Sequence, residues 1–271
     1  MKKSFSNFSW WIKKKLYGLK PVINPAAKTP ALRLGLDSRL HSYRALALFS
    51  WLRLFKAMLF FFLLLNAANA QETKPPFWND IQAFKKQDSA DFPGTNKILF
   101  IGSSSFTMWT DVQAYFPSHP VINRGFGGST LLDQLRYVKD VVFPYKPKQV
   151  VIYCGENDLA SSDTVTAKIV YNRFRQLFNL IRSMFSNVSI IYISMKPSPS
   201  RQLLMGKMRE GNSLIRSFLK SKKQTGFVDI YKEMIDDEGK PRPELFGDDN
   251  LHMNKNGYAI WKKAIEPYLK K

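Results

Sequence analysis

The stretch KILFIGSSS, at residues 97–105, runs from a short apolar segment into a glycine and three serines. A similar segment, QVVIYC at 149–154, is followed by GEND at 155–158. Short, continuously apolar segments of this kind are typical of strands in a parallel sheet that is covered on both faces. Ligands of such sheets bind at the carboxyl ends of the strands, so both polar segments are expected at one site.

Short apolar segments alternate with amphipathic helical patterns from residue 97 to the C-terminus, as expected of βαβ units with right-handed crossovers. We therefore predict one three-layer α/β/α domain over 71–271, with a polar, proline-containing lead-in at 71–95. The predicted strands are 97–101, 121–123, 149–154, 188–195 and 227–231. The predicted helices are 106–116, 131–142, 164–185, 201–220 and 256–269, the last one capped by Asn254.

Positive charge is concentrated at the N-terminus. The chain carries a net charge of +20, and residues 1–56 contain twelve Lys/Arg and one acid. The remaining 57–271 has neither a basic helix interleaved with aromatic residues nor zinc-finger spacing, so nucleic acid is not expected as a partner. Its net charge of +9 is compatible with acidic partners such as anionic polysaccharide, and equally with ordinary solvated surface.

Residues 1–70 are predicted to be a basic leader that ends in a signal peptide. Arg53 and Lys56 form a positive n-region, 57–65 is an unbroken apolar h-region, and Ala68-Asn69-Ala70 predicts cleavage after Ala70. These features predict export to the periplasm or the extracellular space. Because the signal begins so far along the chain, we also predict that the true start lies near residue 50.

A retained signal anchor is the alternative. Nine apolar residues are too few to cross a bilayer, which takes about 20. Extending the segment back to Ala45 would include Arg53 and Lys56, which disfavours spanning. A membrane is therefore expected as a partner only if the leader is retained.

Four short segments carry the residue types of an acyl-transfer site: 102–105, 123–128, 155–158 and 249–252. They supply a serine nucleophile, a glycine amide and an asparagine side chain as oxyanion donors, and an Asp/His pair as oriented base. Any one of these segments alone is weak evidence, but all four in this order predict a serine esterase.

Ser104 is the predicted nucleophile. Gly102 permits a tight turn at the end of its strand, so the following serines stand above the sheet edge near helix N-terminal amides, which favour negative charge. A serine triplet after a glycine is otherwise most simply a helix cap, and we keep that interpretation for Ser103 and Ser105.

The oxyanion donors are predicted from two glycine-containing segments. The glycines within 125–128 allow a backbone amide to point into the site, although a turn that needs positive φ would select them too. Asn157 can donate from a strand end, although an Asx turn is the simpler explanation of its segment alone. We interpret Glu156 and Asp158 as loop residues that orient Asn157.

Asp249 and His252 are the predicted acid–base pair, since a spacing of three on a turn lets a carboxylate meet an imidazole and fix its tautomer. The chain has three histidines. His41 lies in the leader and His119 in a proline-flanked loop, so His252 is the best candidate base. Cys154, the only cysteine, ends an apolar strand and is interpreted as core filler.

Over roughly residues 97–262 the chain resembles the SGNH (GDSL-type) hydrolases. The resemblance implies Ser104 as nucleophile, Asp249 and His252 as its triad partners, and Gly128 and Asn157 as oxyanion donors beside the Ser104 amide. It also implies a flavodoxin-like sheet of five parallel strands. The chain departs from the family's Gly-Asp-Ser-Leu because Ser103 replaces the acid, which removes a charge beside the predicted nucleophile but no catalytic group.

These observations predict an exported serine ester hydrolase that needs no metal or cofactor. Exported members of the family often deacetylate carbohydrates, so a small acyl group on a carbohydrate or other alcohol is the expected substrate. A lysophospholipase or thioesterase-type acylhydrolase is the first alternative. A catalytically silent binding protein on the same fold is the second, because fold alone does not fix function.

Overall fold

A computed structural model describes residues 50–61 and 74–271, and the chain divides between Thr73 and Lys74. Residues 50–61 are helical and exposed. The predicted h-region begins within this helix, whereas residues 62–65 and the predicted cleavage after Ala70 lie outside the described residues. In the part of the chain that the structure describes, no helix is both long enough and apolar enough to cross a bilayer.

The second unit is built on a sheet of five parallel strands in the order β2-β1-β3-β4-β5. This confirms the predicted fold class and is the flavodoxin-like order. The chain first adds β2 on one side of β1 and then β3 on the other, so the topological switch point lies between β1 and β3. The strands are β1 (Ile98–Gly102), β2 (Val121–Gly125), β3 (Gln149–Tyr153), β4 (Ser189–Ile193) and β5 (Thr225–Val228).

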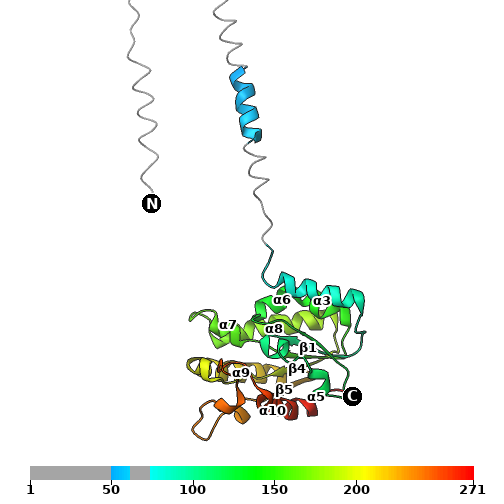
Figure 1. Ribbon diagram of the computed structural model, residues 1–271, viewed down its shortest axis with the longest axis vertical. Coiled ribbons are helices and arrows are strands. Elements are labelled where there is room, and N and C mark those ends of the chain that lie inside the picture. The colour runs from blue at the N-terminus through cyan, green and yellow to red at the C-terminus, as the bar shows by residue number, and fades with distance from the viewer. Residues whose placement is uncertain (1–49, 62–73) are drawn as a thin grey trace, which may run out of the picture. The chain divides into compact units, whose positions relative to one another are not determined.

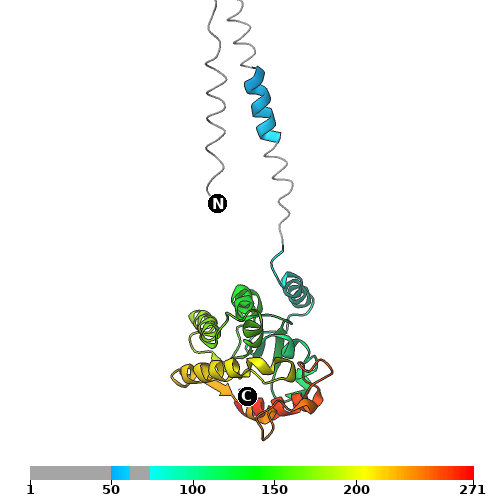
Figure 2. The same ribbon diagram turned by 90° about the vertical axis from the view of Figure 1, so that its left-hand side faces the viewer.

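Buried side chains alternate between the two faces of the sheet and form two cores. Leu99 and Ile101 of β1 belong to the core covered by α6 (Leu131–Val141), α8 (Ala167–Met184) and α9 (Met205–Lys220). The neighbouring β1 residues, Ile98 and Phe100, belong to the core on the other face. That face is covered by α4 (Ser104–Thr107), α5 (Val112–Tyr115) and α10 (Lys255–Ile265). Figures 1 and 2 show α6 and α8 on one side of the sheet and α10 on the other.

Most predicted elements are present, with boundaries shifted by a few residues. Asn254 caps α10 as predicted, since its side chain accepts hydrogen bonds from the amides of Asn256 and Gly257. The predicted helix at 201–220 begins as a 3-10 turn, η2 (Pro199–Leu204), before α9. The predicted strand at 227–231 is wrong by two to three residues, because β5 pairs with β4 from Thr225 to Val228.

Three other local predictions are wrong. The lead-in at 71–95 contains α3 (Trp78–Ala90), whose only buried residue is Ile81, so it lacks a clear apolar stripe. The helix predicted at 106–116 is split into α4 and α5, because Trp109 turns into the core between them. The segment after β3, predicted to be a loop, starts the short helix α7 (Glu156–Ala160).

The carboxyl ends of β1, β2 and β3 are level with one another, because Gly102 pairs with both Gly125 and Tyr153. Gly102 has a φ of +146°, and a Cβ there would overlap the carbonyl oxygen of Tyr153. Only glycine therefore lets β1 leave the sheet this close to β3. The residues that follow β1 and β3 consequently emerge side by side at the switch point.

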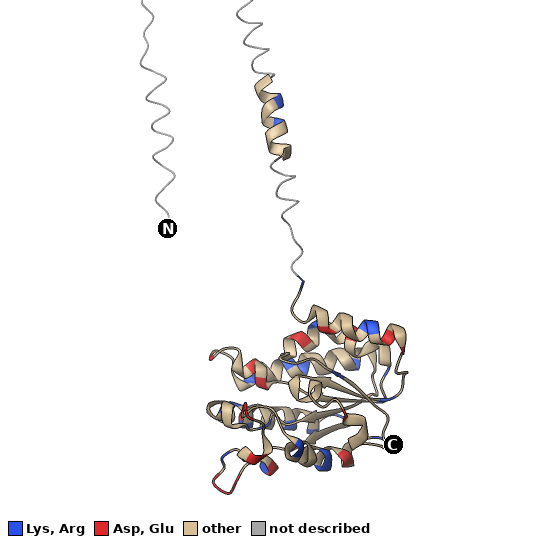
Figure 3. Ribbon diagram, in the orientation of Figure 1, with Lys and Arg blue, Asp and Glu red and all other residues tan. Residues whose placement is uncertain are grey.

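Charges of both signs are distributed over the elements of 74–271 (Figure 3). Several form ion pairs within or between neighbouring helices, such as Lys85 with Asp140 and Lys262 with Glu266. Both of these pairs are partly exposed, and pairs of this kind contribute little to stability.

Candidate active site

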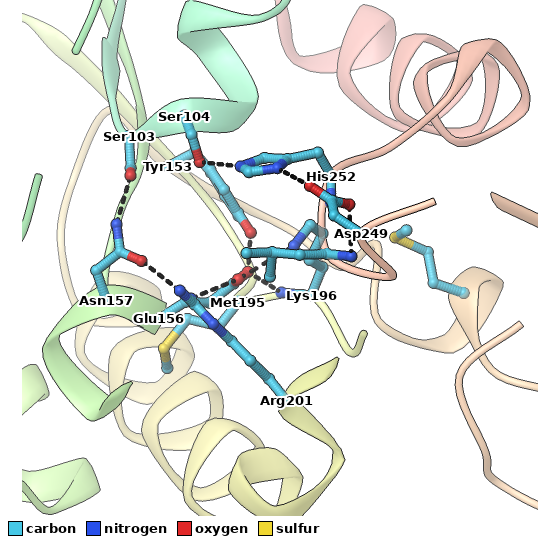
Figure 4. A network of polar contacts seen from close by, with 12 residues as sticks. Ser103, Ser104, Tyr153, Glu156, Asn157, Met195, Lys196, Arg201, Asp249 and His252 are labelled. Atoms are coloured by element: carbon cyan, nitrogen blue, oxygen red, sulfur yellow. Dashed lines mark hydrogen bonds and ion pairs between the residues drawn. The ribbon is translucent and has the colours of Figure 1, made fainter. Parts of the chain in front are cut away.

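Three segments that are far apart in the sequence meet at the switch point. Ser103 and Ser104 follow β1, Asn157 lies in α7 after β3, and His252 lies in the loop before α10. Figure 4 shows their side chains converging, with Asp249 behind His252. The structure therefore brings together the serine, asparagine and Asp/His segments predicted from the sequence.

The hydroxyl of Ser104 lies 2.9 Å from Nε2 of His252, and Nδ1 of His252 lies 2.5 Å from Oδ2 of Asp249. Oδ1 of the same carboxylate accepts hydrogen bonds from the amides of His252 and Leu251, each at 2.9 Å. These amides, together with the contact to the imidazole, lower the pKa of Asp249 to about 2. An ionised carboxylate accepts from Nδ1–H, which leaves Nε2 free to accept the proton of the serine.

The loop that carries Asp249 and His252 is fixed at both ends. Gly247 donates from its amide to the carbonyl of His252 at 2.9 Å, which closes the turn. Phe246 and Met253 form an antiparallel bridge and are both buried. The loop is thus anchored in the core while its functional side chains face the site.

Asn157 directs its carboxamide toward Ser103. Its Nδ2 donates to the Ser103 hydroxyl at 2.6 Å and to the carbonyl of Ser129 at 3.1 Å. The expectation that Ser103 and Ser105 cap the helix is confirmed only for the position of Ser103: it is the N-cap residue of α4, but its side chain makes no capping bond. The expectation is wrong for Ser105, which lies inside α4 and is buried. Ser103 instead contacts the predicted oxyanion donor.

The glycine segment passes beside the predicted nucleophile. A Cβ on Gly127 would lie 3.8 Å from Cβ of Ser104, so Gly127 lies against it. Gly128 follows with a φ of +81°, and a Cβ there would face the Phe77 ring at 3.8 Å. The assignment of the Gly128 amide as an oxyanion donor stays a prediction.

Neither Glu156 nor Asp158 forms a hydrogen bond with the Asn157 side chain in the described contacts. Asp158 accepts from the Leu131 amide at 2.9 Å and from Arg173 at 2.7 Å, and burial raises its pKa. Glu156 is buried and accepts a hydrogen bond from the Tyr153 hydroxyl. Both carboxylates thus have partners of their own.

The residues that contact Asn157 and Glu156 from the other side were missed. They lie in MKPSPSR, at 195–201, which begins two residues after the end of β4. Lys196 Nζ lies 3.1 Å from Glu156, and Arg201 reaches Asn157 Oδ1 at 2.7 Å. Their place in the sequence could have indicated them, because they follow a predicted strand and the carboxyl ends of parallel strands meet at the same edge of the sheet.

In the contacts that the structure describes, neither Cys154 nor His119 bonds to the side chains of Ser104, His252 or Asp249. Cys154 is buried, its thiol contacts the carbonyl of Ser129 at 3.6 Å, and burial raises its pKa well above the usual range. This confirms the interpretation of Cys154 as core filler. His119 contacts the carbonyl of Lys270 through Nδ1 at 3.1 Å, near the C-terminus.

The cavity beside Ser104 is small, with a volume of about 10 Å³. That is close to the room that one water molecule needs. Most of its lining residues are polar, and Leu251 is the only aliphatic side chain among those that the structure describes there. The space enclosed beside Ser104 is therefore about the size of one water molecule and has no room for a long acyl chain.

The comparisons with known proteins agree with this architecture. Residues 101–260 match the GDSL-like lipase/acylhydrolase family. The match covers more than half of the chain, and the protein belongs to this family of hydrolases. A search of the curated proteins found no match.

Solved structures share the fold. A GDSL-like lipase from Bacteroides thetaiotaomicron VPI-5482 is 22% identical, with a TM-score of 0.59 over 69% of this chain and 95% of the other. An acetyl xylan esterase from Geobacillus stearothermophilus is 18% identical, with a TM-score of 0.52 over 65% and 95%. At these identities the likeness shows the fold alone.

Proposed function

We propose that this hydrolase is a serine esterase in which Ser104, His252 and Asp249 form the catalytic triad. The observation that carries the proposal is the chain of contacts from Ser104 Oγ to His252 Nε2 and from His252 Nδ1 to Asp249. In such a chain the imidazole removes the serine proton as the hydroxyl attacks, and the carboxylate stabilises the imidazolium that forms.

The reaction has two halves. Ser104 Oγ bonds to the carbonyl carbon of the ester while His252 takes the hydroxyl proton. The bond to the alcohol oxygen then breaks, and His252 returns the proton to the departing alcohol. In the second half, His252 takes a proton from water as the water oxygen attacks the acyl carbon. His252 then gives that proton to Ser104 Oγ as the bond from Oγ to the acyl carbon breaks, which releases the acid and restores the serine hydroxyl.

The negative oxygen of the tetrahedral intermediate needs donors placed in advance. Ser104 is the first residue of α4, and amides of a helix's first turn have no partner within the helix. Asn157 supplies an NH₂ group that lies beside the Ser103 hydroxyl. We assign these two groups and the Gly128 amide to the oxyanion hole.

We propose a small acyl group, such as acetyl, carried by a carbohydrate or another alcohol. The size and polar lining of the cavity beside Ser104 support a short acyl chain, because a long chain needs an extended apolar groove. The acetyl xylan esterase with the same fold adds support by analogy only.

Hydrolysis of p-nitrophenyl acetate by the wild type and by Ser104→Ala tests the proposal. We expect wild-type activity that disappears in the variant, and slower hydrolysis of the corresponding long-chain esters. Faster hydrolysis of long-chain esters would favour a lysophospholipase-type or thioesterase-type acylhydrolase. Wild-type activity that survives in Ser104→Ala would overturn the assignment of the nucleophile.

We further propose that the protein is exported. The support is the sequence of the leader: Arg53, Lys56, the apolar stretch at 57–65 and the small residues before Gln71. N-terminal sequencing of the protein from the culture medium or the periplasm should begin at Gln71. A chain that starts upstream and remains with the membranes would instead indicate a retained signal anchor.

A further inference from the structure

Arg201 joins the predicted oxyanion donor to a buried carboxylate. Its Nη2 donates to Oδ1 of Asn157 at 2.7 Å, and its Nη1 donates to Oε2 of Glu156 at 3.3 Å. Figure 4 shows the guanidinium extending to both residues. The side chain is 17% exposed, so water competes weakly for these contacts. A planar fork with two separate donor nitrogens suits this double contact, and a lysine could not make it in the same geometry.

These contacts fix which way the carboxamide of Asn157 points. A guanidinium has donors only, so the atom of Asn157 that faces Arg201 must be the carbonyl oxygen. At the other end, the carbonyl of Ser129 accepts only, so the atom that faces it must be the NH₂ group. Both ends of the amide therefore select the same orientation, with the NH₂ group facing the Ser103 hydroxyl and the Ser129 carbonyl.

Arg201 is itself held in place. The Glu156 carboxylate that accepts from Arg201 also accepts from the Lys196 amide and from Lys196 Nζ, each at 3.1 Å. Lys196 is fully buried, and this burial lowers its pKa. Pro197 and Pro199 restrict the backbone between Lys196 and Arg201. The segment that carries Arg201 therefore loses little conformational entropy when Arg201 binds Asn157.

We propose that Arg201 is a positioning residue for ester hydrolysis: it fixes and polarises the carboxamide of Asn157 so that its NH₂ group meets the oxyanion. The inference rests on the proposed serine-esterase function. A positive group on the carbonyl end of an amide makes its N–H a stronger donor, because hydrogen bonds in a chain polarise one another. Arg201 acts through Asn157 and does not touch the ester.

A double-mutant cycle tests this role in the full-length protein. Arg201→Met keeps an unbranched apolar stem and removes the guanidinium with its donors, and Glu156 keeps Lys196 and Tyr153 as partners. We expect kcat for p-nitrophenyl acetate to fall at least tenfold with KM nearly unchanged. The loss should not exceed that of Asn157→Ala, about a hundredfold to a thousandfold for an oxyanion donor.

The decisive comparison is Arg201→Met in the Asn157→Ala background. If Arg201 works through Asn157, the second substitution should change kcat less than about twofold there. An equal loss in both backgrounds, or no loss in the wild type, would overturn the inference. Arg209→Met is the matched control, because Arg209 has a single long contact, 3.4 Å to the Tyr231 hydroxyl, and should leave kcat unchanged.

Two further measurements keep the outcome clear. If Arg201→Met does not fold, Arg201→Lys replaces it in the double-mutant cycle. The loss of kcat is again compared between the wild-type and Asn157→Ala backgrounds. The rate of covalent labelling of Ser104 by a fluorophosphonate, followed by intact mass, replaces kcat if the acetate ester is a poor substrate. Activity that survives in Ser104→Ala would overturn the proposed esterase, whereas Arg201 variants that match the wild type would overturn this inference alone.

Discussion

At the scale of single residues, Ser103 and Ser104 are neighbours with different surroundings. Ser104 contacts His252, whereas Ser103 accepts a hydrogen bond from Asn157. We expect Ser103→Ala to lower kcat for p-nitrophenyl acetate by less than about tenfold, because one neutral hydrogen bond contributes about 0.5–1.5 kcal/mol and Asn157 keeps its other partners. A loss as complete as that of Ser104→Ala would contradict these separate roles.

Asp249 gives a prediction about pH. Its pKa is depressed to about 2 from an ordinary 3.8, so its carboxylate favours the folded state above pH 3.8. That contribution is lost as the pH falls through about 2. The stability difference between the wild type and Asp249→Asn, measured by urea unfolding, should be constant above pH 4.5 and shrink toward pH 2. A difference that persists unchanged at pH 2 would contradict this assignment.

The proposed nucleophile, base and carboxylate were accessible from the sequence, since each has a side chain suited to one step and a place after a strand or before a helix. Arg201 was not accessible, because a lone arginine in a proline-containing loop is typical of solvated surface. Its role depends on the distance to Asn157, which lies 44 positions away in the chain. Only the fold brings the two together.

At the scale of elements, α3 is attached to the domain by a polar contact. Asp88 of α3 pairs with Arg124 at the end of β2 and accepts from the Tyr145 hydroxyl, and both members of the ion pair are at most 18% exposed. Burial and the bond to Asp88 raise the pKa of Tyr145 to about 12, so this hydroxyl remains a donor throughout the physiological range.

We expect Asp88→Ala to lower the free energy of unfolding by about 1.5–3 kcal/mol, because it leaves a poorly hydrated guanidinium without its carboxylate. Lys85→Ala is the control on the same helix. The ion pair of Lys85 with Asp140 is partly exposed, so Lys85→Ala should lower the free energy of unfolding by less than about 1 kcal/mol. Denaturant unfolding of both variants measures the difference, and equal losses would rule out this attachment.

The elements that periodicity predicts well are those with a complete apolar face. The helices α6 and α8 bury several residues at helical spacing, and the strands β1, β3 and β4 are short, mostly apolar and fully buried. In contrast, α3 buries only Ile81 and depends on the ion pair of Asp88, a tertiary contact that a local pattern does not contain. The turn between α4 and α5 depends likewise on the burial of Trp109.

At the scale of the whole molecule, both described cores are built from residues of the second unit. Their members run from Ile81 to Leu269, on the two faces of one sheet. We therefore expect residues 74–271 produced alone to keep the melting temperature of the full chain within about 3 °C and its esterase rate within twofold. Aggregation or loss of cooperative melting would show that the first unit is needed.

For the proposed reaction, the exposure of the site differs between its two sides. Asp249 is 50% exposed and His252 24%, whereas Ser103 and Glu156 are each 6% exposed. The alcohol receives its proton from His252 and so departs toward open solvent, while the acyl group enters the closed side. For this reaction the site limits the size of the acyl group that is removed, and it places no limit on the size of the alcohol that carries the acyl group. An ester on a polymer of any length could be cleaved without a tunnel for the chain.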